Sequence, residues 1–116
     1  MIVLYGIDSC DSCRKARRFL AANGLTHRFH DLRKQGVDAA LLAHWLQVIG
    51  PERLLNRRST TWRSLDETQR SRAEGTEMLK LLIEHPTLIR RPVLDAPNAC
   101  LAGFDETAYR EALLDE

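Results

Sequence analysis

The chain has 116 residues, of which 44% are hydrophobic and 28% are charged, and its formal net charge is +1. This length suits about one domain with a single core, and this composition excludes disordered and fibrous proteins. The balance of 17 basic against 16 acidic side chains does not favour direct binding to nucleic acid. No apolar run approaches the ~20 residues that cross a bilayer, so we expect no membrane partner.

The first third of the chain predicts a βαβ unit. Residues 2–5 form an apolar run that suits a strand buried on both faces. Apolar side chains then recur at helical spacing from Cys13, which predicts a helix over residues 11–23. Residues 26–32 have the pattern of a second strand, and residues 34–36 mark a turn.

The middle of the chain predicts a helical insertion at about residues 37–90. Asp38 is a suitable N-cap for a helix that reaches residue 49, and a second helical pattern covers residues 76–84. Residues 54–62 are polar and rich in arginine, and they predict a loop between short helices.

The last third predicts a hairpin and a helix. Pro92 leads into a strand at residues 93–94, a second strand follows at residues 99–102, and Asp105 caps the last helix. We therefore predict an α/β fold in a single domain, residues 1–116, with a mixed sheet built in the order βαβ, helical insertion, ββα and with helices on its faces.

Cys10 lies where the first strand ends and the first helix begins. A Cys-x-x-Cys motif in this context is typical of a thioredoxin-like redox site. Backbone N–H groups and the helix dipole stabilise a thiolate there, and Arg14 adds positive potential. Asp11 would act in the opposite direction if its carboxylate faced the sulfur, and the sequence leaves its orientation open.

The other two cysteines have less certain roles. Cys13 is one helical turn from Cys10 and within reach of a disulfide, but it also lies on the apolar face of the helix. It is therefore either a resolving cysteine or part of the core. We expect Cys100, in an apolar strand, to be a small core residue. The chain's start lacks the pattern of a signal peptide, so we expect a cytoplasmic protein with reduced cysteines.

A zinc site is an alternative use of the cysteines. Cys10, Cys13, His27 and His30 resemble a two-cysteine, two-histidine set. The histidines, however, are separated by only two residues and would point to opposite faces of a strand. We therefore predict no metal site.

Arg91 and Pro92 form a second candidate group. If the strand after Pro92 folds back beside the first strand, Arg91 lies near the turn that carries Cys10. Arg57, Arg58 and Arg90 are either further anion-binding residues or solvated surface charges.

A set of short motifs runs through the chain in the order Tyr5-Gly6-Ile7, Cys10-Asp11, Lys15-Ala16-Arg17, Phe29-His30-Asp31, Leu55-Asn56-Arg57, Thr60-Thr61-Trp62-Arg63, Arg91-Pro92-Val93-Leu94 and Gly103-Phe104. Together they resemble the arsenate reductase-related ArsC/Spx/YffB family, and most closely its YffB-like branch. The resemblance covers essentially the whole chain. It implies a thioredoxin-like fold with a helical insertion, a nucleophile at Cys10 and a cis proline at Pro92.

The YffB-like branch implies a thiol-disulfide oxidoreductase, specifically a glutathione-dependent thiol reductase. We expect glutathione as co-substrate, no tightly bound cofactor, thiol or disulfide substrates, and a monomer. The expected catalytic residues are Cys10, Cys13 and Arg91. The expected substrate-binding residues are Arg57, Arg58, Arg91, Pro92 and Arg14.

The same resemblance implies two alternative functions. Arsenate reductases of this family hold the oxyanion with three arginines; Arg91 matches one, Arg57 or Arg58 approximates another, and Gly103 stands at the third position. Spx-type regulators, which bind RNA polymerase, have a stretch similar to the one from Ser9 to Arg17, including the second cysteine. An arsenate reductase and a redox-sensing transcription regulator are therefore the alternatives.

Overall fold

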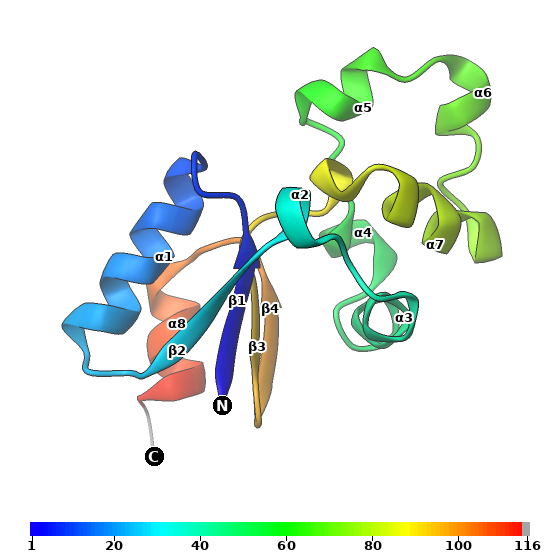
Figure 1. The fold of residues 1–116 in the computed structure, drawn as a ribbon. Helices are drawn as coiled ribbons and strands as arrows, with labels where there is room; N and C mark the ends of the chain where they lie inside the picture. Colours follow the sequence, from blue (N-terminus) through cyan, green and yellow to red (C-terminus); the bar gives the residue numbers. More distant parts are fainter. Residues whose placement is uncertain (115–116) are drawn as a thin grey trace. The chain divides into compact units, whose positions relative to one another are not determined.

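A computed structural model describes residues 1–114 (Figure 1). The chain divides into two compact units. The first unit combines Met1–Leu32 with the chain from Arg91 onward, and the second unit is residues 33–90. The second unit begins close to the start of the predicted helical insertion. That the two units make a single domain stays a prediction.

The first unit contains a four-stranded mixed sheet. Its strands are β1 (Ile2–Gly6), β2 (His27–Asp31), β3 (Val93–Ala96) and β4 (Ala99–Ala102). They lie in the order β2-β1-β3-β4. Strand β1 is parallel to β2 and antiparallel to β3, and β3 is antiparallel to β4. The predicted α/β class and the predicted order of elements along the chain are confirmed.

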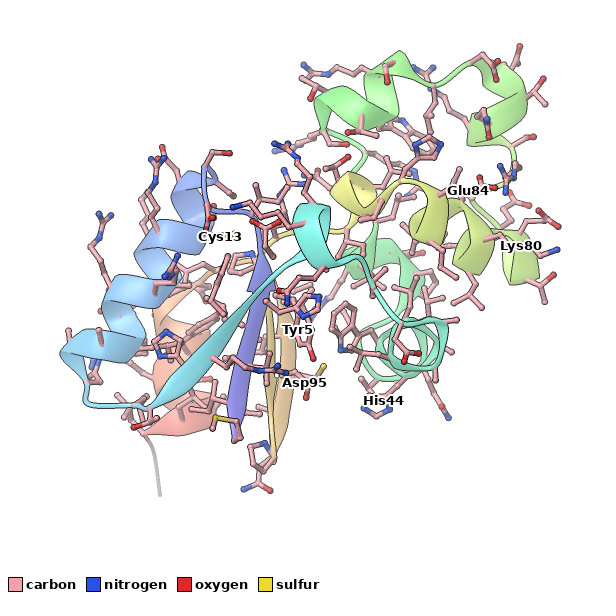
Figure 2. All side chains as sticks on the ribbon, viewed as in Figure 1. Tyr5, Cys13, His44, Lys80, Glu84 and Asp95 are labelled. Atoms are coloured by element: carbon pink, nitrogen blue, oxygen red, sulfur yellow. The ribbon has the colours of Figure 1, made fainter. Side chains whose placement is uncertain are left out.

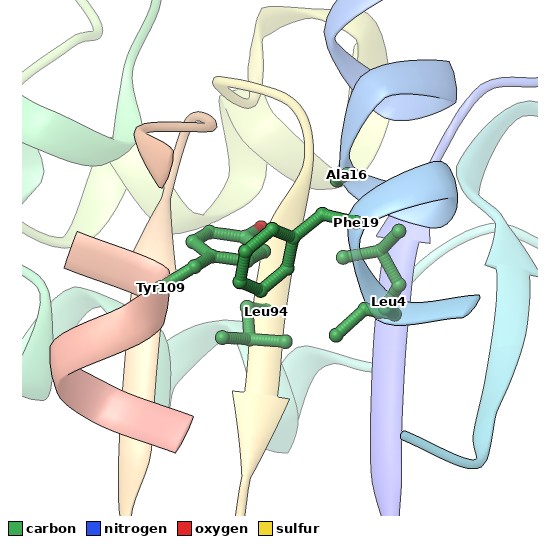
Figure 3. Packing of buried hydrophobic residues seen from close by; sticks show 6 residues of the cluster. Leu4, Ala16, Phe19, Leu94 and Tyr109 are labelled. Atoms are coloured by element: carbon green, nitrogen blue, oxygen red, sulfur yellow. The ribbon is translucent and has the colours of Figure 1, made fainter. Parts of the chain in front are cut away.

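Helices α1 (Asp11–Ala22) and α8 (Glu106–Leu113) pack on one face of this sheet (Figures 1 and 3). Leu4 and Leu94 are partners in the β1–β3 register, so both side chains point to this face. The cluster that they form with the helices consists of six buried residues, Leu4, Ala16, Phe19, Leu20, Leu94 and Tyr109. Burying each leucine side chain contributes about 2 kcal/mol relative to leaving it exposed.

The second unit is helical. Its elements are α2 (Leu32–Gln35), which starts at the boundary, then α3 (Ala39–Val48), α4 (Pro51–Leu54), α5 (Thr60–Ser64), α6 (Glu67–Arg70), α7 (Gly75–Glu84) and the 3-10 helix η1 (Pro86–Leu88). The two longer predicted helices are confirmed as α3 and α7. Asp38 caps α3 as predicted, because its carboxylate accepts a hydrogen bond from the N–H of Ala40 at 2.7 Å.

Three details differ from the predictions. The predicted loop at residues 54–62 ends in α5, because the Ser59 hydroxyl accepts the N–H of Trp62 at 3.1 Å and caps a helix there. Most of the turn expected at residues 34–36 belongs to α2. Cys100 is half-buried rather than part of the core, because β4 is an edge strand with a neighbour on one side only.

The two ends of the second unit are held together. Leu55 and Ile89 form an antiparallel bridge, and the N–H of Arg90 donates to the carbonyl oxygen of Leu54 at 2.7 Å. The Arg90 guanidinium donates to the carbonyl oxygen of Arg53 at 2.8 Å. Arg90 is therefore a structural residue of this junction rather than a solvated surface charge.

Candidate functional site

Cys10 is the N-cap of α1. Its N–H donates to the carbonyl oxygen of Ile7 at 3.1 Å, which closes a turn at the end of β1, and its carbonyl oxygen accepts the N–H of Arg14 at 3.0 Å. Serine or aspartate, with a stronger oxygen acceptor, would cap this helix better; the half-buried sulfur of Cys10 stands in the capping position instead.

The Cys10 sulfur is surrounded by hydrogen-bond donors. Burial by itself raises the pKa of Cys10, but the backbone N–H of Cys13, the Cys13 thiol and the Arg91 side chain all donate to the sulfur and outweigh this effect. The pKa of Cys10 is therefore lower than that of an ordinary cysteine. A sulfur in this environment carries more thiolate at neutral pH, and the thiolate is the nucleophilic form.

Cys13 is buried with no exposed surface, and Figure 2 shows it in the first turn of α1. Burial raises the pKa of the Cys13 thiol, although a hydrogen bond from the N–H of Ile7 opposes the shift. A Cβ atom on Gly6 would overlap the Cys13 sulfur, so glycine permits this close contact between β1 and α1. Cys13 is thus packed in the core and also hydrogen-bonded to Cys10.

Arg91 and Pro92 precede β3, which pairs with β1. The peptide bond between them is cis, as the family resemblance implies. The carbonyl oxygen of Pro92 accepts the N–H of Gly103 at 2.8 Å. The expected position of Arg91 beside Cys10 is confirmed by the hydrogen bond between them, whereas the roles of Arg91 and Pro92 toward a substrate stay predictions.

By the family resemblance, Gly103 is predicted to stand at the position of the third arginine in the arsenate reductase pattern. Its φ angle is 80°, in the left-handed region that residues with a Cβ atom rarely adopt. The turn that brings its N–H to Pro92 therefore favours glycine, and an arginine could not be introduced there without backbone strain.

Arg14 and Asp11 are paired with each other. The guanidinium of Arg14 lies 3.2 Å from the Asp11 carboxylate, and both side chains are largely exposed. The Asp11 carboxylate, whose orientation the sequence left open, is thus bonded to a cation. Exposed pairs of this kind contribute little to stability. The role of Arg14 in substrate binding stays a prediction.

Arg57 and Arg58 belong to the second unit, and both are exposed. The Arg57 guanidinium lies over the Trp62 ring, 5.4 Å from its centroid. The backbone N–H of Arg58 donates to the side-chain oxygen of Asn56 at 3.0 Å. Their predicted role in substrate binding stays a prediction.

Sequence reasoning missed two contributors to this site. The N–H of Ile7 donates to the Cys13 sulfur, and Gly6 lets that sulfur approach the backbone. A glycine that ends an apolar strand just before a Cys-x-x-Cys motif was the available signal for the close approach. The backbone hydrogen bond could not be read from residue types.

The histidines of the zinc alternative make other contacts. His27 donates through Nδ1 to the carbonyl oxygen of Leu25 at 3.0 Å, if that nitrogen carries the proton. The His30 ring lies against Tyr5, with centroids 4.8 Å apart. Among residues 1–114, no group of three or more His, Cys, Asp or Glu side chains is placed to hold a metal ion. Within the same residues, no helix has the length and apolar character needed to cross a bilayer.

Comparison with protein-family models gives a match to the ArsC family over residues 5–112. Global transcriptional regulator Spx 2 of Bacillus anthracis is 30% identical over 115 residues, which are 97% of this chain and 87% of the regulator.

Two solved structures are also similar. One, named YFFB protein, is 38% identical with a TM-score of 0.92, and the match covers 97% of this chain and 99% of that one. The other, an arsenate reductase (ArsC) related protein from Brucella melitensis, is 35% identical with a TM-score of 0.73 over 97% of this chain and 94% of that one. The fold shared with these neighbours is thioredoxin-like, and the similarities together support a thiol oxidoreductase superfamily.

Proposed function

Because the chain belongs to the ArsC family, we propose that it is a glutathione-dependent thiol reductase in which Cys10 is the nucleophile. The observation that carries the proposal is the set of donors around the Cys10 sulfur, which lowers the pKa of this cysteine against the effect of burial. A thiolate held at a helix N-terminus beside an arginine is suited to attack a disulfide.

In the first step, the Cys10 thiolate attacks one sulfur of a disulfide or of a glutathione mixed disulfide. A bond forms between Cys10 and that sulfur, the substrate's S–S bond breaks, and the other sulfur leaves with the electron pair as a thiolate. Arg91 keeps a positive charge beside the reacting sulfurs and would stabilise the negative charge spread over them in the transition state.

In the second step, a thiol must resolve the mixed disulfide on Cys10. Glutathione thiolate attacks, the Cys10 thiolate is released, and a disulfide that contains glutathione is formed. Cys13 could attack instead, but burial raises its pKa and holds it in the unreactive thiol form. We therefore infer that glutathione is the main resolving thiol. That the enzyme is a cytoplasmic monomer is part of the same proposal.

The test is turnover of a glutathionylated peptide with and without glutathione. Cys10→Ser should abolish the activity, Cys13→Ser should retain most of it, and omission of glutathione should stop multiple turnovers. Full activity in Cys10→Ser with loss in Cys13→Ser would assign the nucleophile to Cys13. Multiple turnovers without glutathione, supported by another thiol reductant only, would remove the glutathione dependence.

A redox-sensing regulator is the second candidate. It is favoured by the 30% identity to Spx 2 over 115 residues and by the two neighbouring free cysteines, Cys10 and Cys13. It predicts that the chain associates with RNA polymerase and that the association differs between oxidising and reducing conditions. Co-purification that is absent under both conditions would remove this candidate.

Arsenate reduction is the third candidate, and the glycine at position 103 argues against it. It predicts arsenate-dependent oxidation of glutathione that requires Cys10. We expect this rate to be no greater than that of a Cys10→Ser control.

A further inference from the structure

A groove lies between α1 and α8, wholly within the first unit. Its volume is about 370 Å³. Its lining includes Lys15, Arg18 and Phe19 of α1, Phe104 in the loop before α8, and Glu106 and Arg110 of α8. We call it the α1–α8 groove.

The groove is lined by two cations of α1 that have no acidic partner among residues 1–114. Arg14 is paired with Asp11, and Arg17 lies 3.4 Å from Asp8 and 4.4 Å from the Phe29 ring centroid. Lys15 and Arg18, in contrast, form no ion pair or hydrogen bond with any residue from 1 to 114.

Lys15 and Arg18 lie beyond the first turn of α1, so the helix dipole has little effect on either cation. On the opposite wall, Arg110 is already bonded to Glu106 at 3.0 Å. The uncompensated positive charge of the groove therefore comes from Lys15 and Arg18.

The floor of the groove is aromatic and preorganised. The rings of Phe19 and Phe104 are 6.0 Å apart, and each packs edge to face with Tyr109, which is fully buried. The Arg110 guanidinium lies over the Phe19 ring, 5.3 Å from its centroid. Phe19 is buried, so the partly exposed Phe104 is the aromatic surface that the groove offers beside its free cations. Carboxylates beside one apolar side chain would match this combination.

The groove is linked to the Cys10 site along the chain, and it lies close to that site along the axis of α1. Phe104 follows Gly103, whose N–H is bonded to Pro92, and Pro92 follows Arg91, which donates to the Cys10 sulfur. Along α1, Lys15 lies about 8 Å from Cys10 at a rise of 1.5 Å per residue. An extended segment in the groove could therefore present a neighbouring disulfide to Cys10.

We propose that the α1–α8 groove binds an acidic segment of a protein substrate, so that the preferred substrates are disulfides flanked by aspartate or glutamate and an apolar residue. This proposal rests on the proposed thiol reductase function. Nucleic acid is a poorer occupant, because Glu106 lines the groove and the whole chain carries a net charge of only +1.

Two glutathionylated peptides test the proposal, one with Asp, Glu and Phe around the modified cysteine and one in which Asn and Gln replace the acids. The variants are Lys15→Gln/Arg18→Gln and, as a control with the same change in net charge, Arg28→Gln/Lys80→Gln at exposed positions outside the groove. The groove variant should raise KM for the acidic peptide about five- to tenfold at low salt, with kcat unchanged. Added salt should reduce the difference.

The outcomes separate the two proposals. Turnover of both peptides with equal KM, or equal effects of the groove and control variants, would overturn the groove proposal and leave the reductase proposal intact. If neither peptide is turned over, the reductase proposal fails, and fluorescence anisotropy of a labelled, cysteine-free acidic peptide on Cys10→Ser protein decides the groove question. Binding that Lys15→Gln/Arg18→Gln removes supports the groove. No binding, or binding only of a labelled DNA oligonucleotide, overturns it.

Discussion

The Cys13 thiol donates a hydrogen bond to the Cys10 sulfur, and the backbone N–H of Cys13 donates to the same atom. One residue therefore supplies two of the donors that stabilise the Cys10 thiolate. This contact gives Cys13 an electrostatic role toward Cys10 even if no disulfide forms between them.

The first prediction separates the two donors of Cys13. Cys13→Ala removes the thiol donor and keeps the backbone N–H, so the pKa of Cys10 should rise. Cys13→Ser retains a hydroxyl donor and should produce a smaller rise. The measurement is the rate of alkylation of Cys10 against pH in a Cys100→Ala background. Identical titration curves for the two variants and the parent would show that the thiol donor has no influence.

The second prediction concerns Arg91, whose side chain also donates to the Cys10 sulfur. Arg91→Gln should raise the pKa of Cys10 and lower kcat/KM by about tenfold at neutral pH, because a charged hydrogen bond to the thiolate is lost. Arg91→Lys should recover part of the pKa shift because it keeps the charge. Arg28→Gln on the exposed surface of β2 is the control and should change neither quantity.

The third prediction uses the contact between Gly6 and Cys13. Gly6→Ala should lower the free energy of unfolding by about 1–3 kcal/mol, because its Cβ overlaps the Cys13 sulfur. In a Cys13→Ala background the sulfur is absent, and the same substitution should cost at least 1 kcal/mol less by the order of such coupling energies. Urea denaturation of the four proteins measures this. Additive effects would contradict the packing described.

The fourth prediction is a loss of stability at alkaline pH. Burial, followed by the charge of Asp95 opposite it in the β3–β4 register, raises the pKa of Cys100 to about 11. In the unfolded chain this thiol ionises near its ordinary pKa of ~8.5. Above that pH, its ionisation stabilises the unfolded state relative to the folded state and lowers the free energy of unfolding. The contribution of the Cys100 thiol to the free energy of unfolding is thus complete below pH ~8.5. It declines as the pH rises toward about 11, the pKa of Cys100 in the folded protein.

Cys100→Ala provides the comparison for this alkaline loss. The variant should show a flatter dependence of the free energy of unfolding on pH over that window than the parent. Burial also raises the pKa of Cys13, so part of the decline in the free energy of unfolding with pH should remain in the variant. Parallel curves for variant and parent would contradict the prediction.

Periodic patterns made the sheet and the longer helices predictable. The apolar run before Cys10, the helical spacing from Cys13 and the hairpin after Pro92 each correspond to an observed element. The sequence predicts short helices beside the loop at residues 54–62 but does not give the bounds of α5 and α6. Each of these helices spans little more than one turn, which is too short for a hydrophobic period to repeat. Only capping residues such as Ser59 could have indicated them.

The site was predictable in position and less so in detail. A cysteine at a strand-to-helix junction and an arginine before a returning strand follow from element order, and Cys10 and Arg91 do meet. The pairing of Asp11 with Arg14 and the bond from Ile7 to the Cys13 sulfur depend on side-chain rotamers and backbone geometry. Residue types alone do not determine either of these.

The pairing of β1 with β3 joins segments from the two ends of the chain, with all of residues 33–90 between them. During synthesis the amino-terminal βαβ segment emerges long before its partner strand, and such non-local pairing is a late event in folding. Until β3 is in place, Cys10 lacks the donor supplied by Arg91. A nascent or truncated chain would therefore carry a less reactive thiol, and full reactivity would be reached only when the last strands have been added.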